Sequence, residues 1–364
     1  MIPFTPYRLH LNVTSLNRLL MKLKLLFILL SLFVFGQSFA KEVNGDFKPN
    51  GTLGFSQTVY GNAGGYQTEI SHPSLWLNYN FSPTWNLDLQ WDRTWGLFDY
   101  TGAPNQQYGY YSQPTGTITY DYGNLGDSKI NWSSSLMFEN QDNMLGLSTN
   151  YIYAQTAFDF SQYLPKTDMI KASQFAVSPQ YVYSWNSTGP GGQANTAGLA
   201  LLTEWELPAN FSLVVNAYTF KEWYTGAFQI SGADQIYSNA QYFVALAWLK
   251  YNKTLLKFDE NTSLGFNFIG GLDPYMSSNR NASWEPFIAS NAQYEWLGPT
   301  VQSSYYKNTY ILFALPQLKL SYKIDEKVTV DLFLQVKYSN QVWGASEGGF
   351  SFMPQGGVSV TYNF

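Results

Sequence analysis

Apolar and polar residues alternate along much of the chain beyond residue 40, and this period of two predicts β-strands. The clearest stretch runs from Trp85 to Asp92, where every odd-numbered residue is apolar and every even-numbered residue is polar. The same alternation occurs in five more segments, at 75–81, 130–138, 199–207, 328–338 and 358–364. Each segment is expected to form a strand with one apolar face and one polar face.

Weaker alternation marks further strands. Together with the six clear segments they make fourteen, and bacterial single-chain barrels use an even number. We therefore predict an all-β fold, a transmembrane antiparallel up-and-down β-barrel of about 14 strands, with 12 to 16 as the range. The weaker segments are 52–60, 116–122, 145–153, 175–185, 211–219, 242–251, 263–268 and 309–324.

A soluble β-sandwich would alternate in the same way, because its polar face meets water and its apolar face a core. The connections favour the barrel, since short and long ones alternate as in outer-membrane barrels. The expected short connections are 82–84, 123–128, 208–210 and 325–327, and the expected long ones are 96–114, 186–196, 221–240, 270–308 and 339–355. Aromatic residues also gather near the ends of the apolar faces, as membrane interfaces require. A soluble secreted β protein stays the fold alternative.

The N-terminal segment matches a secretory signal peptide. Two lysines, Lys22 and Lys24, precede the apolar run 25–35, and Ser38 and Ala40 form a small-x-small cleavage site. We predict a signal peptide at 21–40, a misassigned upstream start at 1–20 and a single barrel domain at 41–364. The alternative for the apolar run is a single transmembrane anchor, for which it is short.

Composition narrows the function. The chain has 364 residues, 20 Lys and Arg against 25 Asp and Glu, 18% aromatic residues and no Cys. Such a chain folds and has no disulfide, thiolate metal site or cysteine nucleophile. Removing residues 1–40 would change the formal net charge from −5 to −9 and leave His72 as the only histidine. We therefore predict no metal site, no cofactor, no enzymatic activity and no nucleic-acid partner.

The last nine residues, 356–364, read GGVSVTYNF. This segment resembles the terminal β-signal of bacterial outer-membrane barrel proteins, with a final Phe, an aromatic residue two positions earlier and apolar residues at alternate positions. The resemblance implies the cell outer membrane as location, its lipid and lipopolysaccharide as surroundings, and the barrel assembly machinery as partner. In size the chain is similar to porins, including those of the FomA type. The residues of this assembly signal are Val358, Val360, Tyr362 and Phe364.

If the polar faces line a lumen, charged residues on them are candidates for contact with permeating ions. Acidic residues outnumber lysines among these candidates, and acidic groups favour cations, so we expect a mild cation preference. The alternative is that these charges pair within the wall or lie in bulk solvent at strand ends. The pore-lining candidates are Asp88, Asp92, Glu204, Glu206, Asp331, Lys319, Lys323 and Lys337.

These observations predict a porin, a passive channel for small hydrophilic solutes, with both termini periplasmic and the long loops extracellular. Segment 270–308 either folds inward to narrow the pore or stays at the surface. The first rival is an adhesin or structural barrel with a plugged lumen, favoured by bulky residues on polar faces. These are Phe333, Met137, Trp76 and Leu202.

The second rival is an outer-membrane hydrolase at His72, with Glu69 and Ser71 as its sequence neighbours. The plainer expectation is that His72 is a solvated loop residue. The sequence leaves open whether the protein is a monomer or a trimer.

Overall fold

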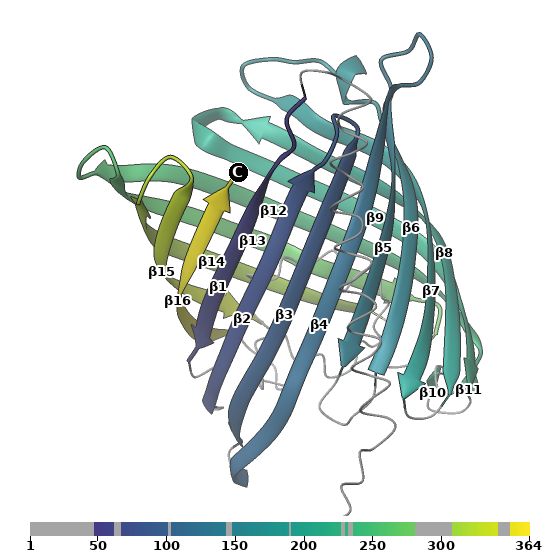
Figure 1. Cartoon of the computed structure of the whole chain (residues 1–364). Helices are drawn as coiled ribbons and strands as arrows, with labels where there is room; N and C mark the ends of the chain where they lie inside the picture. The colour runs from purple at the N-terminus through teal and green to yellow at the C-terminus, as the bar shows by residue number, and fades with distance from the viewer. Residues whose placement is uncertain are drawn as a thin grey trace, which may run out of the picture.

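Fourteen antiparallel strands close into a barrel in the computed structural model, which confirms the predicted fold class and strand number (Figure 1). The structure describes residues 47–61, 67–100, 103–142, 148–188, 191–226, 230–231, 236–280, 308–340 and 350–364. The predicted signal peptide and upstream start therefore lie outside the described residues, as do residues 281–307 of segment 270–308.

Each barrel strand pairs with its neighbours along the chain, except that β12 follows β9 because β10 (Ile230–Ser231) and β11 (Ile236–Tyr237) form a separate two-stranded sheet. The barrel strands are β1 (Asn50–Tyr60), β2 (Gln67–Asn80), β3 (Trp85–Tyr100), β4 (Ala103–Asn124), β5 (Asn131–Asp142), β6 (Ser148–Asp159), β7 (Lys171–Thr188), β8 (Gly192–Leu207), β9 (Phe211–Gly226), β12 (Asn239–Lys257), β13 (Thr262–Ser278), β14 (Asn308–Lys323), β15 (Val328–Ser339) and β16 (Ser351–Asn363).

The barrel closes where β1 pairs with β16. The ladder runs from Thr52 opposite Asn363 to Tyr60 opposite Gln355. It is extended by two backbone hydrogen bonds of 3.1 Å between Gly51 and Phe364. Every strand of the barrel therefore has a partner on both sides, which leaves no open sheet edge among these strands.

We call the end of the barrel where β1 begins and β16 ends the termini end. Its connections are short, and the four predicted short connections are confirmed by the breaks between β2 and β3, β4 and β5, β8 and β9, and β14 and β15. Two of the connections at this end contain a single turn of 3-10 helix, η1 (Ser161–Tyr163) and η2 (Pro208–Asn210).

Two of the predicted long connections are wrong. Segment 96–114 lies in strands, because β3 continues to Tyr100 and β4 starts at Ala103, and segment 186–196 contains only a short break after Thr188. Backbone pairing continues here beyond the alternating part of the sequence, as in the ladder pair Gly96 and Tyr108. The Gly, Asn and Gln residues that resemble a loop are carried by a ladder that needs no side-chain pattern.

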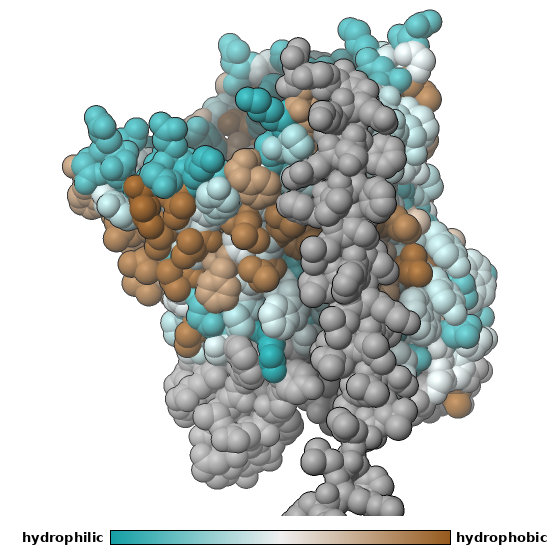
Figure 2. Space-filling model, in the orientation of Figure 1, coloured by the Kyte–Doolittle hydropathy of each residue, from teal (hydrophilic) through white to brown (hydrophobic). Residues whose placement is uncertain are grey.

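The two faces of the wall differ in polarity. Cross-strand partners point to the same side and successive residues to opposite sides, so exposure at a few positions orients every strand. Large apolar side chains are exposed on the outer face, with Leu332 54% and Leu334 71% exposed. Figure 2 shows hydrophobic residues gathered at mid-height over the strands at the left of the view, with hydrophilic residues above them at the termini end.

Aromatic rings form a continuous row on the outer face near the termini end. Successive ring centroids lie between 3.8 and 6.2 Å apart from β16 through β2, β3, β4 and β5 to β6. Rings in such contact attract one another and have an apolar body with a polar tip. The members of this aromatic row are Phe364, Tyr79, Phe81, Trp85, Tyr120, Tyr122, Trp132 and Phe158.

Asp325 fixes the turn between β14 and β15. Its carboxylate accepts the backbone N–H groups of Lys327 at 2.7 Å and Val328 at 2.8 Å, and these bonds lower the pKa of Asp325 below its ordinary value. The stabilisation is present above the pKa of an unfolded Asp and is lost as pH falls through the lowered pKa. Asp325→Ala should therefore lower the Tm in detergent at pH 7 and have little effect at pH 2. The exposed neighbour provides the control Glu326→Ala; an equal Tm loss at both pH values would contradict this assignment.

Candidate functional site

The inner wall of the barrel has two halves of different character. On β1 to β6 the inward positions are mostly polar, and we call this surface the polar half. For example, Asp88 lies between Asn78 on β2 and Thr117 on β4 in the ladders, and its carboxylate accepts a hydrogen bond of 3.1 Å from Asn78. Its other members include Ser56, Ser74, Asn86, Gln90, Asp92, Gln113, Thr115, Thr119, Ser135 and Glu139.

Two buried carboxylates lie close together in the polar half. Asp92 is 4% exposed and accepts a hydrogen bond of 2.9 Å from Gln90. Glu139 is 1% exposed and accepts from Gln113 at 2.7 Å and also from Gln141. The polar half therefore concentrates negative charge on β3 to β5.

His72 is not the solvated loop residue expected from the sequence. It lies within β2 on the inner wall, with Nε2 3.4 Å from Asp92 Oδ1. Ser71, its neighbour in the hydrolase hypothesis, points to the outer face and accepts a hydrogen bond of 2.7 Å from Gln57. Ser71 and His72 are therefore on opposite sides of the wall and do not form a catalytic pair. The side chain of Glu69 is outside the described residues.

Several of the predicted pore-lining charges are paired within the wall. Glu204 contacts Lys250 at 2.8 Å, and Lys319 contacts Asp331 at 3.4 Å. The pair of Glu206 with Lys171, at 2.6 Å, is largely exposed near the termini end. The lysines neutralise most of the acidic excess on this side of the barrel.

Of the remaining candidates, Lys323 is exposed at the last position of β14, whereas Lys337 is 1% exposed within the wall. Sequence reasoning missed two inward charges, Glu139 and Lys250. Glu139 is the next polar-face position after segment 130–138, and Lys250 is on an even position of segment 242–251. Extending the alternation by one step would have found both.

The second half of the inner wall is apolar, and we call it the apolar half. Its side chains, on β7 to β9 and β12 to β14, form one buried cluster, against which Met137 and Leu202 pack. The four bulky residues predicted on polar faces all point inward, and two of them sit over glycines. The main members of this half are Val182, Val214, Tyr218, Phe220, Tyr242, Val244, Leu246, Trp248, Ile269, Met276, Phe313 and Leu315.

One carboxylate is buried inside the apolar half. Glu222 is 2% exposed, accepts a hydrogen bond of 3.1 Å from the hydroxyl of Thr196 and another from that of Tyr224. The Tyr224 and Tyr242 hydroxyls lie 3.2 Å apart. These bonds satisfy Glu222 in place and make it a structural part of this half.

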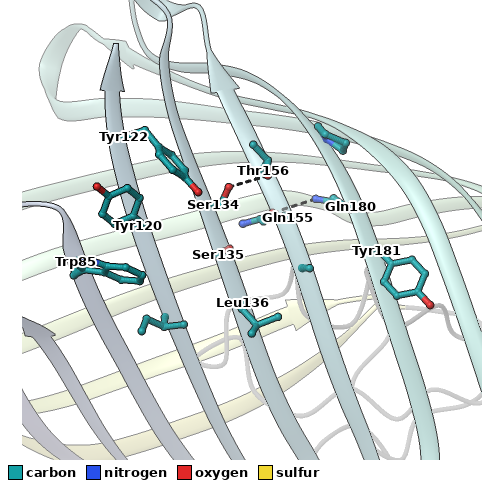
Figure 3. A pocket seen from close by; sticks show the side chains of 13 residues that line it. Trp85, Tyr120, Tyr122, Ser134, Ser135, Leu136, Gln155, Thr156, Gln180 and Tyr181 are labelled. Atoms are coloured by element: carbon teal, nitrogen blue, oxygen red, sulfur yellow. Dashed lines mark hydrogen bonds between the residues drawn. The ribbon is translucent and has the colours of Figure 1, made fainter. Parts of the chain in front are cut away.

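A groove of about 540 Å³ lies on the wall formed by β3 to β7, below the aromatic row. Figure 3 shows Trp85, Tyr120 and Tyr122 at one side and Tyr181 at the other. The hydroxyls of Ser134 and Thr156, 2.9 Å apart, belong to the outer face, whereas Gln155 and Gln180 pair at 3.3 Å on the inner face (Figure 3). The groove faces away from the barrel interior and is not a route for a solute.

Among the described residues, no group of three or more His, Asp or Glu side chains is arranged to hold a metal ion. Neither of the short helices in the same part of the chain has the length and hydrophobicity needed to cross a membrane. The inner wall is therefore the surface on which a function can be sought.

The fold and the two-faced wall define the class: a closed antiparallel β-barrel with an apolar outer face. No protein-family model and no curated protein matches the sequence. Solved structures with a similar fold include a bacterial polysaccharide outer membrane secretin, with 9% identity, a TM-score of 0.42 and coverage of 86% of this chain and 98% of that one.

Two further similar structures are the toluene transporter TodX of Pseudomonas putida and the outer membrane channel DcaP of Acinetobacter baumannii. TodX is 8% identical with a TM-score of 0.34 over 86% of this chain and 89% of that one. DcaP is 9% identical with a TM-score of 0.34 over 87% and 96%.

Proposed function

We propose that this chain is an outer-membrane channel through which small hydrophilic solutes and ions diffuse passively. The observation that carries the proposal is the combination of a closed barrel, an exposed apolar outer face and a polar half on the inner wall. A closed barrel satisfies every backbone group within hydrocarbon, and an apolar exterior is stable only there. Such a wall lets water and solutes pass on the inside while lipid surrounds the outside.

The orientation in the membrane is part of the proposal. Short turns at the termini end suit the periplasmic side, and the aromatic row near that end suits the level of the lipid headgroups. Lipid and lipopolysaccharide would then contact the outer face. We also propose that the strand ending at Phe364 is read by the barrel assembly machinery, since Val360 and Tyr362 are exposed on the outer face of β16.

The proposed ion preference rests on the polar half. Asp88 and Glu139 accept hydrogen bonds from neutral amides, and the partner of Asp92 is a histidine. Their negative charge is therefore less compensated than that of the acidic residues paired with lysines. We expect cations to be favoured near β3 to β5.

A barrel with a filled interior, serving as an adhesin or structural protein, is the second candidate. It is favoured by the apolar half, whose side chains are almost completely buried although they point inward. Side chains that fill an interior leave less room for water, so this half reduces the open cross-section.

Conductance across a planar bilayer under a salt gradient tests the proposal. The purified protein should give reproducible current steps with a cation-selective reversal potential. Asp88→Asn should lower the cation-to-anion permeability ratio about two- to fourfold, because a charge about 5–8 Å away in water attracts a cation by about 0.5–0.8 kcal/mol. Glu206→Gln, at an exposed lysine-paired position, is the control and should change the ratio little.

The outcomes separate the two candidates. Insertion without current steps would reject the channel and favour the filled barrel. Steps with an anion-selective reversal potential would keep the channel and reject the assignment of Asp88.

A further inference from the structure

A second group of buried charges lies on the inner wall at β13, β15 and β16. Asp273 is 3% exposed, Lys337 is 1% exposed and Gln355 is 4% exposed. Lys337 is opposite Met353 on β16, so Gln355 is the next inward residue along that strand. Three polar side chains are thus held among almost fully buried neighbours.

The two charges attract each other without touching. Asp273 and Lys337 interact electrostatically. Of the described residues, however, only four other pairs bring an acid and a base within 4.0 Å. An opposite charge that faces a buried carboxylate from beyond contact distance leaves room for a bridging polar group.

The hydrogen-bonding capacity of this group is incompletely used. Within the described part of the chain, no hydrogen bond of normal geometry reaches either carboxylate oxygen of Asp273 or the Nε2 atom of Gln355. The other end of the Gln355 amide is used, since its Oε1 accepts from Gln335 at 2.5 Å. Besides Lys337, the indole of Trp248 is the polar group that faces Asp273.

Unmade hydrogen bonds in buried surroundings are costly, at about 1–3 kcal/mol for each group and more for charged groups. The acceptors belong to Asp273, whereas the donors belong to Lys337 and Gln355. A partner that satisfies both sides must donate and accept at the same time. A hydroxyl group does both.

The surroundings favour a neutral partner over a zwitterion. Burying a further charged group in this site would add a large desolvation cost, whereas hydroxyl groups carry no net charge. Apolar side chains flank the charges, among them Met276 and Met353, each no more than 1% exposed. Apolar walls with a few convergent polar groups suit a molecule with C–H faces and several hydroxyls.

We propose that Asp273, Lys337 and Gln355 form a binding site for a small polyhydroxylated solute, a polyol or sugar, on the inner wall. The solute hydroxyls donate to the carboxylate of Asp273 and accept from the ammonium of Lys337 and the amide of Gln355. This inference rests on the proposed channel, because the solute reaches the site through the interior.

Calorimetric titration of the detergent-solubilised protein with sorbitol tests the site without requiring conductance. Saturable binding is expected, and Asp273→Asn should weaken it about tenfold or more, because a charged acceptor is lost. Asp331→Asn alters another inward lysine–aspartate pair and should leave the affinity unchanged. If Asp273→Asn fails to fold, Gln355→Leu removes only one donor and should weaken binding about threefold or more.

Current recordings with sorbitol separate this inference from the channel itself. Sorbitol should reduce the current in a saturable way that Gln355→Leu weakens, whereas poly(ethylene glycol) of similar size should not saturate. Sorbitol binding in a protein without current steps would reject the channel and retain the site. Current steps without saturable sorbitol binding would reject the site and indicate that water alone bridges the charges. Tighter binding of glycine than of sorbitol would overturn the hydroxyl assignment.

Discussion

Leu332→Lys should lower the free energy of unfolding of the membrane-inserted barrel by about 2–4 kcal/mol. Leu332 is 54% exposed on the outer face, in the middle of β15, where it is opposite Leu320 and Val358. A lysine there would place its charge in hydrocarbon, and at the bilayer midplane this costs about 2–4 kcal/mol. Denaturant unfolding in lipid vesicles, followed by tryptophan fluorescence, measures the change.

The same substitution on the same face of β15, at its first residue, is the matched control. Val328→Lys should cost at most about 1 kcal/mol, because the penalty falls toward the membrane interface. Val328 lies opposite Tyr362 at the termini end of the strand. Equal losses at the two positions would contradict the proposed membrane placement of the outer face.

Gly54→Ala should also destabilise the barrel, by about 1–3 kcal/mol, which is typical for overpacking. Gly54 lies opposite Trp76 on the inner wall, and a Cβ atom at residue 54 would lie 2.1 Å from the indole ring. The ring or the backbone must therefore move. Thermal unfolding in detergent, monitored by the shift in gel mobility of the folded barrel, measures the loss.

Gly265→Ala is the control for the loss of a glycine in a strand, because the nearest atom to its added Cβ would be 3.6 Å away. Trp76→Ala should suppress the effect of Gly54→Ala in the double variant, since the clash disappears with the indole. A loss that persists in the double variant would show that the close approach is not its cause.

The strand number and the two faces of the wall could be predicted from sequence because a membrane barrel is simple in one respect. The wall is one residue thick, so each strand must alternate, and alternation is visible within a segment such as 85–92. Turn signals at Asp325 and at Pro208 marked the termini end correctly. Such local features need no knowledge of which strand lies beside which.

Pairing of charges could not be predicted in this way. Glu204 and Lys250 are 46 residues apart and meet because β9 lies between β8 and β12. Whether two inward charges touch depends on register, and register is set by all the strands together. For the same reason the sequence did not reveal that His72 faces Asp92, or that Asp273 and Lys337 share one buried site.

The contact between β1 and β16 also determines the order of folding. Thr52 and Asn363 hydrogen-bond across 311 positions of sequence, so this ladder carries the largest loss of chain entropy of any strand pair in the barrel. The hairpins can pair locally and early, but β1 keeps one unpaired edge until β16 arrives. An open sheet with a free edge is the species most exposed to aggregation. Closure at β1 and β16 is therefore expected to be the slow and vulnerable step of assembly.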